Sequence, residues 1–206
     1  SVRVSQTSRV DRFENCQGLM VAGFYSEAGD ELRALLVTGY RSALVHARIG
    51  ECCLQLDKPF EAIEHFEAAA VIAASKKGGF DRNAERLQLL DQLALTYEST
   101  GSIPSTIKTL EEMVGLDPAY HNARQRLATL SQSTTKYGQF YGLIRNKMLT
   151  PDQFDAARVK AKQHNKTLDS VLLGDFGIDR KQLGASFSEY YGCPFVEFVD
   201  TEAPEA

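Results

Sequence analysis

Apolar residues recur at intervals of three and four along most of the chain, which is the spacing of one buried face of an α-helix. The pattern begins at Phe13, after a polar stretch over residues 1–12 that is expected to be disordered. Gly29 is expected to end the first helix, with Asp30 capping the next one. The pattern therefore predicts an all-α protein, and it leaves open whether Gly39 divides the helical stretch that follows.

Two segments in the middle of the chain share one layout, in which a helix with a small residue is followed by a turn and a helix with a large apolar residue. Gly50 and Ala94 are the small residues, and Phe66 and Leu110 are the large ones, 44 residues apart in each case. Small residues let two helices approach closely, while large ones wedge between successive hairpins. The layout predicts helical hairpins. The other matched pairs are Cys53 with Tyr97, Ala62 with Thr106, and Ala69 with Met113.

This layout, which covers residues 43–131, resembles the tetratricopeptide repeat. The resemblance implies a helical-repeat domain over residues 13–131. Repeats of that family are usually about 34 residues long. The extra residues fall at Val71–Arg82, so we expect longer helices there and a loop at Lys76–Gly79. A generic helical bundle is the alternative interpretation.

Tetratricopeptide domains commonly bind a peptide or helix in a concave groove, and the resemblance implies such a groove here. By position, it would be lined by Leu44, Ala47, Glu51, Leu54, Gln88, Asp91, Leu95 and Glu98. The Lys and Asn residues that clamp carboxylate tails in some members have no counterparts. The acidic Glu51, Asp91 and Glu98 would favour a basic or amphipathic partner segment. The alternative is that these charges are only solvated surface.

The last third of the chain has its own helical pattern. The polar stretch Ser131–Tyr137 predicts a linker. Thr150 and Pro151 predict a helix start, with Thr150 as N-cap and Pro151 in the first helical position. Asp179 is expected to cap another helix, and residues 195–198 alternate as in a short extended segment.

Two segments in this region share a pattern at an offset of 29 residues. Each has an apolar pair, a short gap, an apolar residue followed by an N-cap, and then an apolar helix position. The first comprises Leu143, Ile144, Leu149, Thr150 and Phe154, and the second Leu172, Leu173, Ile178, Asp179 and Leu183.

Residues 140–200 resemble the N-terminal domain of the assembly ATPases of type II secretion and type IV pilus systems. The resemblance is carried by Met148–Phe154, Leu168–Leu173, Ile178-Asp179 and Tyr191–Val196. It implies a small C-terminal helical domain over residues 138–200, followed by a tail at 201–206. It also implies docking to a component of a bacterial secretion or pilus machine.

In some members this domain binds cyclic di-GMP through a motif that opens with Arg-Leu-Gly and closes on Gln. Here the Arg position holds Thr167, the Gly position holds Asp169, and the closing position holds Tyr190. Thr cannot stack on a base or pair with phosphate as Arg does, although Lys166 would partly replace it. The resemblance thus gives Lys166, Thr167 and Tyr190 as nucleotide-binding candidates, and it favours protein docking over cyclic di-GMP.

Charge and composition narrow the possible functions. Lys and Arg number 23 and Asp and Glu 27, without a basic run, which argues against nucleic-acid binding. The four Cys and four His show no metal-ligand spacing, so neither a metal nor a cofactor is expected. No run of 18 apolar residues and no apolar signal core are present, which predicts a cytoplasmic protein without membrane insertion.

No P-loop, nucleophile motif or paired catalytic carboxylates are found, so the chain is not expected to be an enzyme. The sequence therefore predicts a non-catalytic adaptor of a bacterial type II secretion or type IV pilus system. Three alternatives stay open. They are a cyclic di-GMP-responsive regulatory domain, the regulatory part of a secretion ATPase whose motor lies outside this chain, and a scaffold unrelated to secretion.

Overall fold

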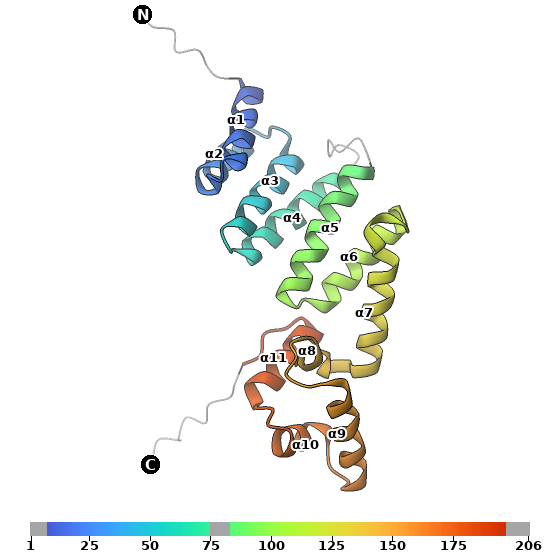
Figure 1. The fold of residues 1–206 in the computed structure, drawn as a ribbon. Helices are drawn as coiled ribbons and strands as arrows, with labels where there is room; N and C mark the ends of the chain where they lie inside the picture. The colour runs from blue at the N-terminus through green and yellow to red at the C-terminus, as the bar shows by residue number, and fades with distance from the viewer. Residues whose placement is uncertain (1–7, 75–82, 197–206) are drawn as a thin grey trace, which may run out of the picture. The chain divides into compact units, whose positions relative to one another are not determined.

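The computed structural model describes residues 8–74 and 83–196, and every regular element within these ranges is a helix (Figure 1). The predicted all-α fold class is confirmed, and the helices pack as tetratricopeptide-like hairpins followed by a small helical region. Residues 1–7, the expected loop at Lys76–Gly79, residues 197–198 and the tail at 201–206 lie outside the described residues.

Contacts between Cα atoms divide the chain into two compact units. The N-terminal unit comprises Ser1–Thr100 with Lys108–Arg126, and the C-terminal unit comprises Gly101–Ile107 with Leu127–Ala206. The domain limits given by the sequence remain predictions.

The first helix, α1 (Arg9–Val21), begins earlier than the sequence suggested. Ser8 and Asp11 form a capping box, in which each side chain accepts a 3.1 Å hydrogen bond from the other residue's backbone N–H. This box satisfies N–H groups that are otherwise orphaned at a helix start. The expectation of disorder over residues 1–12 is therefore wrong for the helical residues 9–12.

Helix α2 (Tyr25–Val37) runs through Gly29, so the predicted break there is wrong. The break lies at Gly23, whose φ of 85° ends α1 in the left-handed conformation that glycine adopts without strain. Gly29 is buried, and a Cβ built on it would lie 3.9 Å from the Cβ of Cys52. Gly29 is therefore a buried residue within α2 rather than a helix stop. Gly39 lies in the turn that follows α2.

Helices α3 (Ser42–Gln55) and α4 (Pro59–Ala74) form the first hairpin of the repeat, and α5 (Asn83–Thr100) packs against α4. A Cβ built on Gly50 would lie 2.7 Å from the ring of Phe66, which is closer than carbon atoms can approach. Gly50 therefore lets α3 approach α4 closely, as the repeat pattern predicts, and the residue that it meets is Phe66 of the same hairpin. The next helix of the layout is α6 (Ile103–Leu116).

The core of the N-terminal unit is built from small and large apolar side chains of α1 to α5. Its members include Phe13, Cys16, Leu32, Leu35, Ile49, Cys52, Cys53, Phe66, Leu89, Leu93 and Tyr97. The positions matched in the second half of the repeat are also buried: Ala94, Thr106, Leu110 and Met113.

Helix α7 (Ala123–Tyr137) includes the polar stretch that the sequence predicted as a linker, so that prediction is wrong. A helix can continue through polar residues when one of its sides packs against another element. Tyr137 meets the ring of Phe154 edge-on at 5.1 Å, and Lys136 pairs with Asp155 at 3.5 Å. Both contacts link the end of α7 to α9 (Pro151–Gln163).

The rest of the C-terminal unit comprises α8 (Tyr141–Arg145), α9, α10 (Leu168–Asp175) and α11 (Arg180–Tyr191). The predicted N-caps are confirmed, since Thr150 and Asp179 each form a capping box with a Gln three residues later. The pattern that recurs at an offset of 29 residues is also seen in the backbone hydrogen bonds. The N–H of Leu149 donates to the carbonyl of Leu143, and the N–H of Ile178 donates to the carbonyl of Leu172.

A close approach between α8 and α11 gives a first testable prediction. A Cβ on Gly142 would lie 2.7 Å from Ser186 Oγ and 2.9 Å from Ser186 Cα, a backbone atom that moves only with α11. Gly142→Ala is expected to destabilise the chain by about 1–2 kcal/mol, because overpacking outweighs the gain in helix propensity. Urea unfolding measures this change. Gly174→Ala, where a Cβ meets nothing within 4 Å, is the control. Equal losses in the two variants would contradict the prediction.

Candidate functional site

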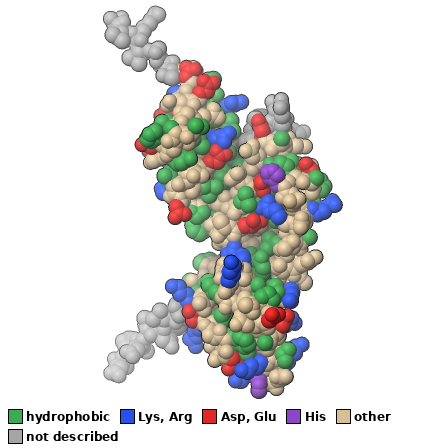
Figure 2. Space-filling view, viewed as in Figure 1, with side chains coloured by type: hydrophobic (Ala, Val, Ile, Leu, Met, Phe, Trp, Pro, Cys, Tyr) green, Lys and Arg blue, Asp and Glu red, His purple; other side chains and the backbone are tan. Residues whose placement is uncertain are grey.

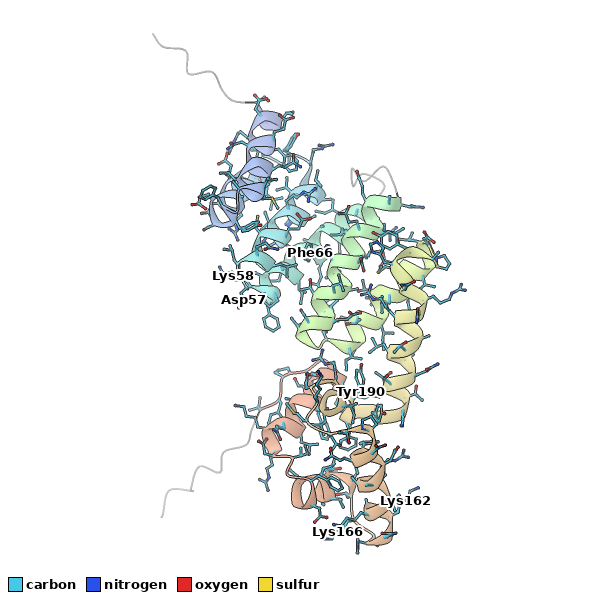
Figure 3. All side chains as sticks on the ribbon, in the orientation of Figure 1. Asp57, Lys58, Phe66, Lys162, Lys166 and Tyr190 are labelled. Carbon is cyan, nitrogen blue, oxygen red and sulfur yellow. The ribbon has the colours of Figure 1, made fainter. Side chains whose placement is uncertain are left out.

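A small cleft lies between α3 and α5 in the N-terminal unit, with a volume of about 120 Å³. Four residues of α3 line one side of it and four of α5 line the other, each set at positions i, i+3, i+4 and i+7. Phe66 of α4 lies between the two sets, where Figure 3 labels it. The two sets are Leu44, Ala47, Arg48 and Glu51 on α3, and Glu85, Gln88, Leu89 and Gln92 on α5.

The packing that forms the repeat also forms the cleft. Gly50 lies on the face of α3 that meets Phe66, and the ring of Phe66 is 1% exposed. The ring thus closes the bottom of the cleft while its buried side packs against α3. Ligand pockets usually span about 300–1,000 Å³. A hollow of this size therefore accommodates a side chain of a larger molecule rather than a complete small-molecule ligand.

Of the three charged side chains that line the cleft, Arg48 and Glu51 pair with each other and Glu85 adds one negative charge. Arg48 Nη1 donates to both carboxylate oxygens of Glu51, at 2.7 and 2.8 Å. Gln88 and Gln92 add amide groups that both donate and accept hydrogen bonds. Figure 2 shows acidic and basic side chains interspersed with hydrophobic ones over this unit, without a continuous patch of one sign on the visible face.

Four of the eight predicted groove residues line this cleft, namely Leu44, Ala47, Glu51 and Gln88. The other four lie elsewhere. Leu54 packs against the core of the N-terminal unit, and Leu95 is exposed. Asp91 and Glu98 belong to a separate ion-pair network.

Asp91 is buried and holds two partners from the segment that follows α6. Its carboxylate accepts from Arg126 at 2.6 Å and contacts Nδ1 of His121, also at 2.6 Å. Arg126 donates in turn to Glu98 at 2.9 Å. Glu51 is paired with Arg48, whereas Asp91 and Glu98 share the single positive charge of Arg126. These arginines reduce the negative charge on which the expectation of a basic partner rested, but they do not cancel it.

Sequence reasoning missed Arg48, Phe66, Glu85, Leu89 and Gln92 as cleft residues. Gln92 could have been predicted from the sequence, because it follows Gln88 by four residues and therefore lies on the same face of the helix. The sequence instead favoured Asp91, which follows Gln88 by three. A helical period of 3.6 permits either choice, and only the packing of α5 decides between them.

The nucleotide-binding candidates are not brought together. Thr167 is the N-cap of α10, and its hydroxyl accepts from the N–H of Ser170. Lys166 lies beside it in the turn after α9, whereas Tyr190 lies near the end of α11. Figure 3 shows Lys166 and Tyr190 at opposite ends of the C-terminal unit. Tyr190 instead lines a separate hollow of about 330 Å³ with Ile103, Pro104, Ile107, Thr134 and Thr135.

Other chemistry is sparse in the described residues. Within residues 8–74 and 83–196, no three His, Cys, Asp or Glu side chains are grouped to hold a metal ion. Burial raises the pKa of the Cys52 thiol to about 11, so it is protonated and a poor nucleophile. Among the helices that the structure describes, none has the length and apolar character needed to span a membrane.

Comparison with known proteins supports the repeat interpretation. No protein-family model matches the chain. Part of the chain is similar to Protein KINESIN LIGHT CHAIN-RELATED 3 of Arabidopsis thaliana, with 33% identity over 91 residues. The match covers 40% of this chain and only 14% of the plant protein. Because that relative contains tetratricopeptide repeats, the match and the all-helical fold together support tetratricopeptide-like repeats in this chain.

Proposed function

We propose that this chain is a non-catalytic protein-interaction module whose cleft between α3 and α5 receives a segment of another protein. The observation that carries the proposal is the cleft itself, in which four residues of α3 face four residues of α5 and Phe66 of α4 lies between them. Grooves of this kind bind extended or helical segments by seating one or two anchoring side chains. The tetratricopeptide-like repeats and the partial match to a repeat-containing relative also support a protein-interaction module.

The chemistry of the cleft indicates what such a segment contains. Leu44, Ala47 and Leu89 offer apolar contact, while Gln88 and Gln92 offer amides that pair with peptide backbone groups. The Arg48–Glu51 pair leaves little net charge on the α3 side. We therefore propose an anchor of one aliphatic side chain on an uncharged stretch of backbone, rather than the basic segment that the sequence alone suggested.

A displayed random-peptide library, selected on the full chain, tests this proposal. Selected peptides are expected to share an aliphatic anchor. Their affinity, measured by fluorescence anisotropy, is expected to fall at least about tenfold in Ala47→Arg, because the large side chain fills a cleft of about 120 Å³. Glu64→Ala, an exposed substitution on α4, is the control and should bind as the parent chain does. Peptides that bind Ala47→Arg and the parent chain equally would contradict the proposal.

For the C-terminal unit we propose docking to a component of a bacterial secretion or pilus machine. The support is the resemblance of residues 140–200, together with capping boxes at Thr150 and Asp179 that recur at the 29-residue offset. A two-hybrid screen of the full chain against secretion and pilus components tests it. Tyr191→Ala, which removes an exposed side chain of α11, is expected to weaken a true contact. Failure to recover any such component would favour a scaffold unrelated to secretion.

The two remaining alternatives have simple tests. Cyclic di-GMP binding would give a saturable calorimetric titration with the full chain, and a flat one would remove it. A regulatory part of a secretion ATPase would be followed in its reading frame by a P-loop, which this chain lacks. Cyclic di-GMP binding remains secondary because Lys166 and Tyr190 lie at opposite ends of the C-terminal unit.

A further inference from the structure

Two histidines meet across the first hairpin of the repeat. His46 of α3 and His65 of α4 lie 19 residues apart in sequence, and their Nδ1 atoms are 2.9 Å apart. The ring centroids are 5.2 Å apart, which is close to the largest separation that such a contact between two imidazole nitrogens allows. The two Nδ1 atoms therefore point at each other along the line between the rings.

This geometry distinguishes between two uses of a histidine pair. Two imidazole nitrogens that bind one metal ion at about 2.0–2.1 Å with a tetrahedral angle lie about 3.3 Å apart, which is farther than the two Nδ1 atoms are here. Here the nitrogens face each other directly, as in a hydrogen bond. No third ligand is grouped with them among the described side chains. The contact is thus a proton-sharing pair, in which one ring donates Nδ1–H and the other accepts with a bare Nδ1.

We propose that the His46–His65 pair is a pH-sensitive latch that holds α3 against α4 at neutral pH and releases it in mild acid. The closed pair tolerates at most one extra proton, placed on the Nε2 of the donor ring. A second proton must go onto the accepting Nδ1, so that two N–H groups on two cations would face each other at 2.9 Å. That arrangement breaks the contact.

The surroundings favour the neutral pair. Burial lowers the pKa of His46. Burial also lowers the pKa of His65, with further lowering from His46 and Arg33, opposed by Glu64 and Glu61. Arg33 comes from α2, and the two glutamates come from α4 itself. A histidine in an unfolded chain has a pKa of about 6.5.

The direction of the pH effect follows from proton counting. Well below pH ~6.5 the unfolded or opened rings bind two protons, whereas the closed pair holds at most one. Stability from the latch is therefore fully present above the unfolded pKa and is lost as the pH falls below it. A difference of one proton makes opening about tenfold more favourable for each pH unit in that range. Because α3 carries half of the cleft, opening would also dismantle the peptide site. This last consequence rests on the proposed function, whereas the latch does not.

Histidine ring NMR and amide hydrogen exchange on the full chain test the latch. At pH ~7.5 one ring of the pair is expected to show the Nδ1–H tautomer and the other the Nε2–H tautomer, and both are expected to titrate below the ordinary histidine pKa of about 6.5. Between pH ~6.5 and ~5.5, exchange of α3 and α4 amides should rise about tenfold relative to His65→Gln at the same pH. The variant serves as reference because it keeps only one ring of the pair, so protonation cannot place two N–H groups against each other.

His46→Gln repeats the test if His65→Gln folds poorly, and His164→Gln should behave as the parent chain. Two outcomes would overturn the latch. One is that His46 and His65 titrate independently at the ordinary histidine pKa of about 6.5. The other is that the parent chain and the Gln variants show the same pH dependence of exchange in α3 and α4. Neither readout involves a peptide, so a failure of the latch is distinguishable from a failure of the cleft to bind.

Discussion

Phe66→Ala is expected to lower the free energy of unfolding by about 3–5 kcal/mol, because it removes a fully buried ring and leaves a cavity beneath the cleft. Gly50 cannot collapse into that space, since glycine has no side chain to fill it. Urea unfolding followed by circular dichroism measures the loss. Phe60→Ala on the same helix is the matched control. Its ring is 71% exposed, so we expect a change of less than about 1 kcal/mol.

A double-mutant cycle sharpens this expectation. Gly50→Ala places a Cβ 2.7 Å from the Phe66 ring and is expected to destabilise the parent chain. In a Phe66→Leu background the clash is relieved, so the same substitution should cost less or become favourable, with a coupling energy of about 1 kcal/mol or more. Gly18→Ala, where a Cβ meets nothing within 4 Å, should not couple to Phe66. Purely additive effects of Gly50→Ala and Phe66→Leu would show that the two residues do not pack as described.

Asp91→Ala is expected to destabilise the N-terminal unit by about 2–3 kcal/mol, since it removes a buried carboxylate that accepts charged hydrogen bonds. Arg126 would keep Glu98, whereas His121 would lose its acceptor. Amide hydrogen exchange should show the loss concentrated near His121, whose left-handed backbone (φ 41°) is held in part by this contact.

The matched control for the Asp91 network is Asp30→Ala. Asp30 also pairs with an arginine, Arg33 at 3.1 Å, but its side chain is 77% exposed. An exposed pair contributes little, so we expect a change within about 0.5 kcal/mol. If Asp91→Ala and Asp30→Ala proved equally mild, Asp91 would be a surface residue that is free to serve a partner, as the sequence had suggested.

Local chemistry explains what the sequence predicted well. Thr150 and Asp179 start helices because each carries a side-chain acceptor with a Gln three residues later, and no other part of the fold is needed. The close approach of α3 and α4 at Gly50 was also predicted, because the repeat places a small residue at this position twice, whereas the contact of Gly50 with Phe66 was not predicted. Each successful prediction rests on residues whose role depends on close neighbours in sequence or on a repeated pattern.

Long-range packing explains what the sequence missed. Gly29 was taken for a helix stop, but it lies buried within α2, where a Cβ would meet Cys52 of α3 at an ordinary contact distance of 3.9 Å. The stretch Ser131–Tyr137 was taken for a linker because its composition is polar, although Tyr137 packs on Phe154. The contact of His46 with His65 was invisible for the same reason. Nineteen residues separate the two rings, and only the hairpin brings them together.

The repeated caps of the C-terminal unit have a consequence for how this part of the chain unfolds. The helix starts at Thr150 and Asp179 are held by their own side chains, so each is self-sufficient. Leu143, Phe154, Leu172 and Leu183 instead share one core. Cooperativity in this unit thus resides in the shared core and not in the helix starts. Damage to the core should therefore unfold the capped helices together, because isolated helices of this length are marginal in water even when their starts are capped.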